Sequence, residues 1–198
     1  MLRNPEKGVG EMRPQSGKAM METRTMTALA ALIAFSVVLT RFLSYAPEGP
    51  LRMSVGNMPI VLAGILFGPV GGALAGFAAD VIGASVQGYG FNPLLIPTPI
   101  LMGLIPGLLR PILDREATYL RFLLVSILPY IVGSIGYQSY ILYTMYGGSY
   151  SIWFIYGWRA VIFIITPLVD TFIIYILFRR NVFAHIGISD ITVKKKAR

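Results

Sequence analysis

The sequence contains no cysteine and a single histidine, and these scarcities exclude several kinds of site. Without cysteine the chain has no disulfide and no thiolate to bind a metal or act as a nucleophile. The one histidine, His185, lies near the C-terminus, so no histidine pair is present for a metal. Walker, HExxH and nucleophile-elbow motifs are also missing. We therefore expect no metal, no cofactor and no catalytic residues, and any ATP-driven step would need a partner.

Charged residues are scarce too, at 13% of the chain, whereas 55% of the residues are apolar. The mean hydropathy is +0.67. This composition is typical of a chain whose solvent is mostly lipid. In a soluble protein a net charge of +8 would suggest nucleic acid, but in a membrane protein it reflects insertion topology and an anionic inner leaflet. We expect no nucleic-acid partner.

Most of the 17 lysines and arginines lie in three clusters, within residues 3–24, 110–121 and 179–198. Because basic loops stay on the cytoplasmic side during insertion, all three clusters should face the cytoplasm. The remaining sequence contains apolar stretches at 25–43, 59–67, 71–86, 94–113, 119–143 and 153–178. The predicted fold is an all-α membrane protein with six transmembrane helices in one compact bundle and both termini cytoplasmic. Residues 1–23 are predicted as a flexible tail, 24–181 as the membrane domain and 182–198 as a basic tail.

Two patterns of small residues concern helix packing. Glycines recur every fourth position at Gly64, Gly68, Gly72 and Gly76, and Asp80 continues the series. In lipid, such spacing lets helix backbones approach closely, so packing is the favoured interpretation, with a helix break at Gly68 and Pro69. On the first predicted helix, Ala30 and Ala34 form a second pair. Its role is either packing within the chain or docking against another membrane subunit.

Three arginines run against the predicted charge bias because they fall on the outer side: Arg41, Arg52 and Arg159. A guanidinium offers a planar fork that suits a carboxylate or a phosphate. The alternative is that each side chain snorkels to lipid headgroups. We favour snorkelling for Arg41 and an anionic ligand for Arg52 and Arg159.

Two carboxylates, Asp80 and Asp170, lie inside predicted helices. An ionised group there costs roughly 3 kcal/mol unless it is paired or hydrated. For Asp170 a structural hydrogen bond within the bundle is favoured, whereas for Asp80 ligand contact and structural pairing are equally good interpretations. An intramembrane enzyme would have to use these two aspartates as its catalytic pair.

Aromatic and amide residues gather at the predicted outer end, namely Gln87, Tyr89, Phe91, Asn92, Tyr137, Gln138, Tyr140, Trp153, Tyr156 and Trp158. Flat rings with a few amides suit a planar heteroaromatic ligand, through stacking and edge hydrogen bonds. An interfacial aromatic belt is the alternative.

Four segments carry a family resemblance: residues 53–60 (MSVGNMPI), 64–69 (GILFGP), 71–76 (GGALAG, followed by Asp80 and Gly83) and 103–107 (GLIPG). With them, the chain over about residues 25–180 resembles the substrate-binding S components of energy-coupling-factor (ECF) vitamin transporters. Arg52, and Arg159 before an apolar last helix, look most like the folate-type branch.

The resemblance implies a subunit of the bacterial cytoplasmic membrane that captures a vitamin from outside with high affinity. It would act with a T component and two ABC-type ATPases, toppling in the membrane to release its ligand. Ala30 and Ala34 match the family's pair that contacts the T component. The segments 52–57 and 87–92 match the loops that close over the ligand.

The predicted substrate-binding residues are Arg52, Asn57, Asp80, Gln87, Asn92, Tyr137, Gln138, Trp153 and Arg159. The two arginines should neutralise ligand carboxylates, Asp80 and Gln138 should bond a heterocycle, and Tyr137 and Trp153 should stack on it. Folate or a derivative is the expected ligand. Pantothenate or another anionic vitamin precursor is the alternative, and a purely structural subunit would bind no small molecule.

Overall fold

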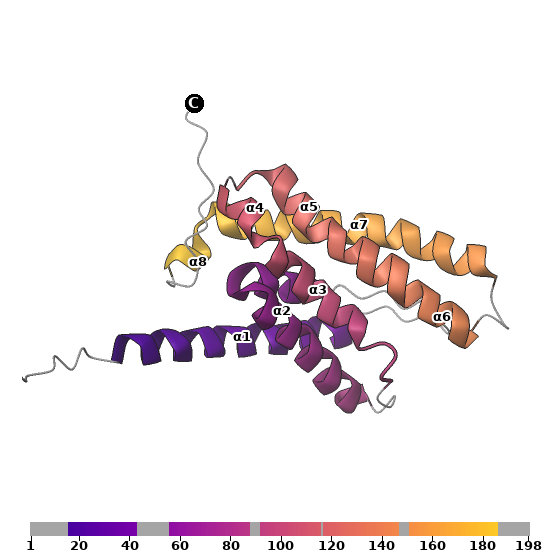
Figure 1. Ribbon diagram of the computed structural model, residues 1–198, viewed down its shortest axis with the longest axis horizontal. Coiled ribbons are helices and arrows are strands. Elements are labelled where there is room, and N and C mark those ends of the chain that lie inside the picture. The colour runs from indigo at the N-terminus through magenta and orange to yellow at the C-terminus, as the bar shows by residue number, and fades with distance from the viewer. Residues whose placement is uncertain (1–15, 43–55, 88–91, 116, 147–150, 186–198) are drawn as a thin grey trace, which may run out of the picture.

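The computed structural model describes residues 16–42, 56–87, 92–115, 117–146 and 151–185, and regular structure within these ranges is entirely helical. Figure 1 shows the arrangement of the helices. They are α1 (Ser16–Phe42), α2 (Met58–Gln87), α3 (Pro97–Leu108), α4 (Arg110–Arg115), α5 (Tyr119–Pro129), the π-helix η1 (Tyr130–Gln138), α6 (Ser139–Tyr146), α7 (Ile152–Arg179) and α8 (Val182–His185). The predicted all-α class is confirmed for these ranges.

In the part of the chain that the structure describes, four helical stretches are long and apolar enough to cross a bilayer: Thr23–Thr40, Met58–Val86, Tyr119–Met145 and Ile162–Arg179. They agree with a helical membrane protein. The count of six spanning helices and the cytoplasmic location of both termini stay predictions. The division into tails and a central domain also stays a prediction, although α1 begins within the first predicted tail and α8 lies in the second.

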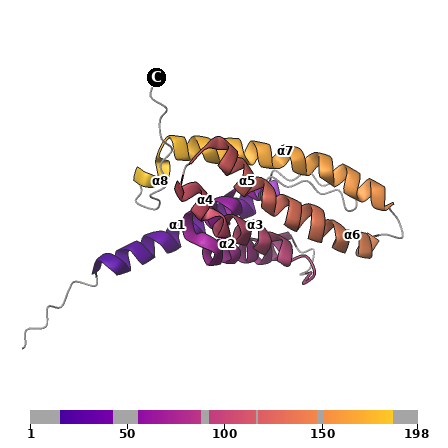
Figure 2. The same cartoon turned by 45° about the horizontal axis from the view of Figure 1, so that its top comes forward.

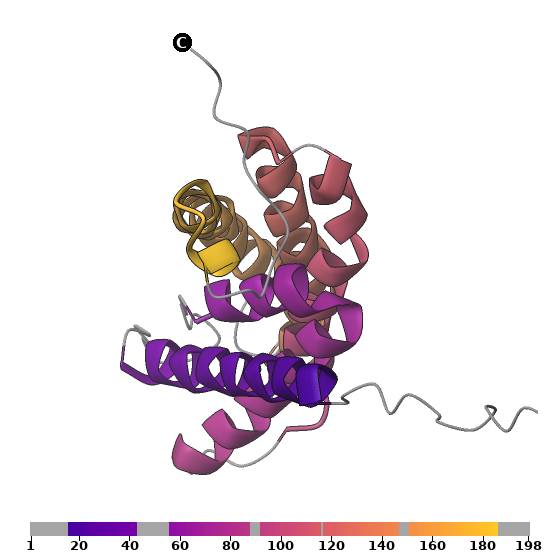
Figure 3. The ribbon, with the colours of Figure 1, turned by 90° about the vertical axis from the view of Figure 1, so that its left-hand side faces the viewer.

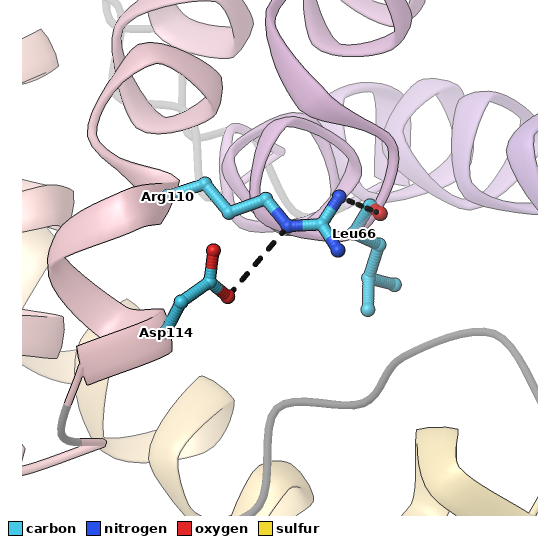
Figure 4. A network of polar contacts seen from close by, with 3 residues as sticks. All are labelled: Leu66, Arg110 and Asp114. Carbon is cyan, nitrogen blue, oxygen red and sulfur yellow. Dashed lines mark hydrogen bonds and ion pairs between the residues drawn. The ribbon is translucent and has the colours of Figure 1, made fainter.

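The break predicted within residues 59–86 is present, and it falls at Gly68. This residue has φ 80° and ψ −173°, which a side chain would make unfavourable, and it divides α2 into two arms. Pro69 follows and has no N–H to continue the helical bonding. At the break, Arg110 Nη1 donates a hydrogen bond of 3.1 Å to the carbonyl oxygen of Leu66, as Figure 4 shows. The arginine therefore satisfies a backbone acceptor beside the break.

The glycine series packs α2 against α3, which confirms the packing interpretation. A Cβ atom on Gly64 or Gly72 would overlap the carbonyl oxygen of Gly103, and one on Gly76 would overlap that of Pro99. The two helices lie side by side in the middle of the molecule (Figures 1 and 2). Their backbones can approach this closely only because side chains are missing at the contact.

Helices α5, η1 and α6 follow one another as a single long rod, and α7 runs antiparallel beside it (Figure 2). At one end of the pair, the Phe122 ring packs on Tyr175 and Phe178 with centroids 5.8 and 5.1 Å apart. The polar residues considered below lie farther along the same contact. Helix α1 lies on the outside of the bundle (Figure 3), and only 11% of its stretch Thr23–Thr40 is buried.

Candidate functional site

The site is built on η1, where the rod widens from α-helical to π-helical turns. The Ser139 hydroxyl donates a hydrogen bond of 3.0 Å to the carbonyl of Ser134, five residues earlier. Turns of this kind are rare and often occur at functional sites, because they free backbone groups and shift side chains. Here they direct the Ser134 carbonyl and the side chains of Gln138 and Ser139 toward α7.

These groups bind Arg159, which is only 4% exposed. Its Nε donates to the Ser139 hydroxyl at 3.0 Å. Its Nη2 donates to Gln138 Oε1 at 2.7 Å and to the Ser134 carbonyl at 3.4 Å. The guanidinium carbon lies 4.7 Å from the centroid of the Phe163 ring, a cation–π arrangement. The Nε and Nη2 edge of the guanidinium is therefore held by oxygen acceptors, and the Phe163 ring lies against one of its faces.

None of these neighbours carries a negative charge. Within the described ranges the only ion pair is Arg110 with Asp114, at 4.0 Å, so no described carboxylate pairs with Arg159. Its Nη1 atom makes no hydrogen bond to any described residue. A buried cation without a counter-charge is costly, and the two N–H donors of Nη1 have no partner among the described residues. This is the chemistry that receives a carboxylate or a phosphate.

A second polar cluster lies on the same pair of helices. The Tyr130 hydroxyl donates a hydrogen bond of 2.5 Å to Asp170 Oδ2, and both residues are 0% exposed. Asn57, the residue directly before α2, is partly buried. Asp170 Oδ1 has no partner among the described residues. The predicted structural hydrogen bond of Asp170 is confirmed, and its partner is Tyr130. The enzyme alternative needs Asp80 as the second carboxylate of a catalytic pair, and it stays a hypothesis.

One aromatic ring joins the two clusters. The rings of Tyr130 and Phe163 are 5.8 Å apart at 41°, and Phe163 is the ring beneath the Arg159 guanidinium. A continuous series of contacts thus runs from Asp170 through Tyr130 and Phe163 to Arg159.

Among the predicted residues, Asn92 and Tyr137 come together through Leu94. The Leu94 N–H donates to Asn92 Oδ1 at 3.1 Å, and the Tyr137 hydroxyl donates to the Leu94 carbonyl at 3.1 Å. The Asn92 amide is also 3.5 Å from the sulfur of Met145. The chain leading into α3 is therefore held against the rod beside Gln138.

The other predicted residues are more scattered. Asp80 is partly buried on the second arm of α2, and Trp153 is 85% exposed in the first turn of α7. Gln87 ends α2, but its side chain lies outside the described residues, as do Arg41's side chain and the whole of Arg52. The ligand contacts predicted for Arg52, Asp80, Gln87 and Trp153 stay predictions, as does the snorkelling predicted for Arg41.

Sequence reasoning missed four residues of the site: Tyr130, Ser134, Ser139 and Phe163. The two serines are five positions apart, a spacing that places residues on one face only in a π-helix. Glycines at 133 and 136 were the one sequence signal that this stretch is irregular.

Comparisons with known proteins place the chain in a family. The family model for ECF-type riboflavin transporter S components matches residues 20–182. The folate transporter FolT of Clostridium novyi (strain NT) is 32% identical over 68 residues, which are 34% of this chain and 38% of that protein. The match thus spans well under half of this curated relative.

Two solved structures share the fold. The crystal structure of FolT bound with folic acid has a TM-score of 0.67 and 26% identity, covering 77% of this chain and 91% of that one. The S component of a bacterial ECF transporter has a TM-score of 0.60 and 22% identity, covering 83% and 98%. Because the family model covers most of its length, the chain belongs to the family of ECF-type riboflavin transporter S components.

Proposed function

We propose that this S component binds folate or a folate derivative for import by an ECF transporter. The observation that supports this most is Arg159, which is buried, cationic and without a described counter-charge. Folate carries carboxylates at one end and a flat heterocycle at the other. The similar fold of FolT bound with folic acid supports the same ligand.

In this proposal the free Nη1 end of Arg159 receives a ligand carboxylate. Ser134, Gln138 and Ser139 hold the opposite edge, so the donors are already oriented before the ligand arrives. The Gln138 oxygen is used by Arg159, which leaves its amide N–H groups to donate to the ligand.

The loop contacts complete the proposed site. Arg52 would neutralise a second carboxylate, Asn57 and Gln87 would close over the ligand, and Asp80 would bond the heterocycle. Tyr137 and Trp153 would stack on the ring, and Asn92 would hold its loop in place through Leu94. The Trp153 side chain is 85% exposed, so this role requires the ring to become covered when the ligand binds.

Titration calorimetry of the detergent-solubilised protein with folic acid tests the proposal. We expect saturable binding, and Arg159→Gln should weaken it by about 2 kcal/mol, roughly 30-fold, because a buried charge pair is lost. Arg179→Gln is the matched control, since Arg179 lies on the same helix but is exposed. That variant should bind as the unmodified protein does.

Riboflavin is the second candidate ligand, because the matching family carries its name. It has no carboxylate, so Arg159→Gln should affect it far less than folic acid. Binding of riboflavin or pantothenate in place of folic acid would keep the family and change the substrate. If no vitamin binds, the proposed capture function is wrong. If Arg159→Gln leaves folic acid binding unchanged, the proposed role of Arg159 is wrong.

We further propose that α1 docks on a T component that works with two ABC-type ATPases. Ala30 and Ala34 are exposed on α1, together with Met26 at 71% and Val38 at 47%. Replacing both alanines by leucine should abolish co-purification with the T component while folic acid still binds. Ala31→Leu is the control, because position 31 is exposed but lies about 100° around the helix from position 30. Unchanged co-purification would exclude this face.

A further inference from the structure

We propose that Asp170 is a positioning residue that sets the geometry of Arg159 through Tyr130 and Phe163 without touching the ligand. The inference rests on the proposed function, because it takes Arg159 as the group that binds the ligand's carboxylate. It follows from the contact series between these four residues.

The first step is the anchoring of Tyr130. Its hydroxyl donates a hydrogen bond of 2.5 Å to Asp170 Oδ2. Both members of the bond are 0% exposed, so water cannot take the place of either partner. The tyrosine ring is therefore fixed at its far end as well as at its backbone.

The second step is the placement of Phe163. The Tyr130 ring lies 5.8 Å from it at an angle of 41°, and the Arg159 guanidinium sits over its face at 4.7 Å. Cation–π attraction depends on the ring face, so a tilt of Phe163 would displace the guanidinium. The position of Tyr130 thus limits where the open Nη1 end can point.

A second route leads from the same bond to the same arginine. Tyr130 is the first residue of η1, and the acceptors of Arg159 come from the later part of that element, Ser134 and Gln138, and from Ser139 just after it. The bond to Asp170 fixes the first end of η1 against α7. Both routes therefore converge on the guanidinium.

Stability alone does not account for Asp170. Its Oδ1 atom has no partner among the described residues, and the side chain makes one hydrogen bond at 0% exposure. A buried carboxylate with one bond stabilises a fold poorly, and an apolar residue of similar size is often as good. A role in orienting Tyr130 explains why position 170 carries a hydrogen-bond acceptor.

A double-mutant cycle with folic acid titration tests the inference. In the otherwise unmodified protein, Asp170→Leu should weaken binding about tenfold, because coupled residues in one network interact by this order. With Arg159→Gln already present, the same change should cost less than about twofold. Asp170→Asn keeps an acceptor for the Tyr130 hydroxyl and should restore most of the affinity.

Ser126→Ala is the matched control for the loss of a buried polar group. Ser126 is 0% exposed, precedes Tyr130 by one turn of the rod, and its hydroxyl has no partner in the described part of the chain. It should bind folic acid normally. Thermal unfolding identifies variants that fail to fold. If Asp170→Leu is one of them, the double variant Tyr130→Phe with Asp170→Asn replaces it in the cycle. This double variant removes the hydrogen bond between positions 130 and 170 but keeps an aromatic ring at position 130.

Each outcome decides the matter. An equal loss in both backgrounds would overturn the positioning role, because Asp170 would then act independently of Arg159. Unchanged affinity would overturn it as well. If the unmodified protein does not bind folic acid, the proposed function fails first, and the inference fails with it.

Discussion

The side chains of Arg159 and Arg110 differ in their exposure and in the partners that they contact. Arg159 is 4% exposed, and its contacts are neutral oxygens and one ring face. The Arg110 side chain is 33% exposed, donates to the Leu66 carbonyl and lies 4.0 Å from Asp114. In the first arrangement the positive charge has no described counter-charge. In the second, the side chain supports the backbone of α2.

The Arg110 contacts predict an order of stabilities. Arg110→Leu should lower the free energy of unfolding by about 1 kcal/mol, because the hydrogen bond to Leu66 at the Gly68 break is lost. Asp114→Asn should cost less than about 0.5 kcal/mol, because the ion pair is exposed. Thermal unfolding in detergent measures both. An equal loss would mean that the ion pair, and not the backbone hydrogen bond, is what Arg110 contributes.

At the scale of single residues, the sequence predicted which residues belong to the candidate site better than it predicted which of them contact one another. Arg159 could be recognised because a cation at the outer end of an apolar helix needs an explanation. Gln138 was predicted as a ligand contact, which stays a prediction, and the structure adds that its oxygen accepts a hydrogen bond from Arg159. The partner could not be foreseen, because the contact depends on turns that differ from the α-helical period.

At the scale of elements, glycine and proline gave the most reliable signals. The break at Gly68 was predicted because Gly-Pro punctuates helices. The stretch predicted at 94–113 contains the whole of α3, but this helix ends at Leu108 and helix begins again as α4 after Leu109. The predicted helix at 119–143 is continuous, although its middle is a π-helix. Apolar periodicity reports which face is buried and is too coarse to separate these helix types.

The α2–α3 contact predicts a large effect from a single methyl group. Gly103→Ala should lower the free energy of unfolding by about 1–3 kcal/mol, because its Cβ would overlap the backbone of Gly72. Gly157→Ala is the control, since among the described residues nothing beyond the adjoining helix backbone lies within 4 Å of its added Cβ. On helical propensity alone it should stabilise slightly. Equal melting temperatures for the two variants would contradict the close approach.

At the scale of the whole molecule, family and helical stretches make this chain a multi-pass protein that fits the bacterial cytoplasmic membrane. In Figure 1, α4, the start of α5 and the end of α7 lie at one end of the bundle, and the end of α6 and the start of α7 at the other. Composition and basic clusters predicted the class, and the family motifs predicted the transporter family. The choice between vitamins was left open, because residue spacing does not show how side chains from separate helices are placed around a ligand.

The orientation is open to a direct test, because the chain has no native cysteine to interfere. Arg115→Cys at the end of α4 and Ser151→Cys directly before α7 place single thiols at exposed positions. In Figure 1, α4 and the start of α7 lie at opposite ends of the bundle. A membrane-impermeant maleimide added to intact spheroplasts should label position 151 and spare position 115 until the membrane is opened. Labelling in the reverse order would invert the predicted topology.

The π-helix also determines the rotational phase of everything that follows it along the rod. Removing one residue from 130–138 would turn α6 by about 100° about its axis, because successive helical residues are that far apart. Leu142, now 8% exposed, would turn away from the interior, while Tyr140, now 59% exposed, would change faces too. Homologues with a one-residue deletion in this segment should therefore need a different set of inward-facing residues in α6. Substitutions that preserve length should be tolerated far more readily than any change in residue count.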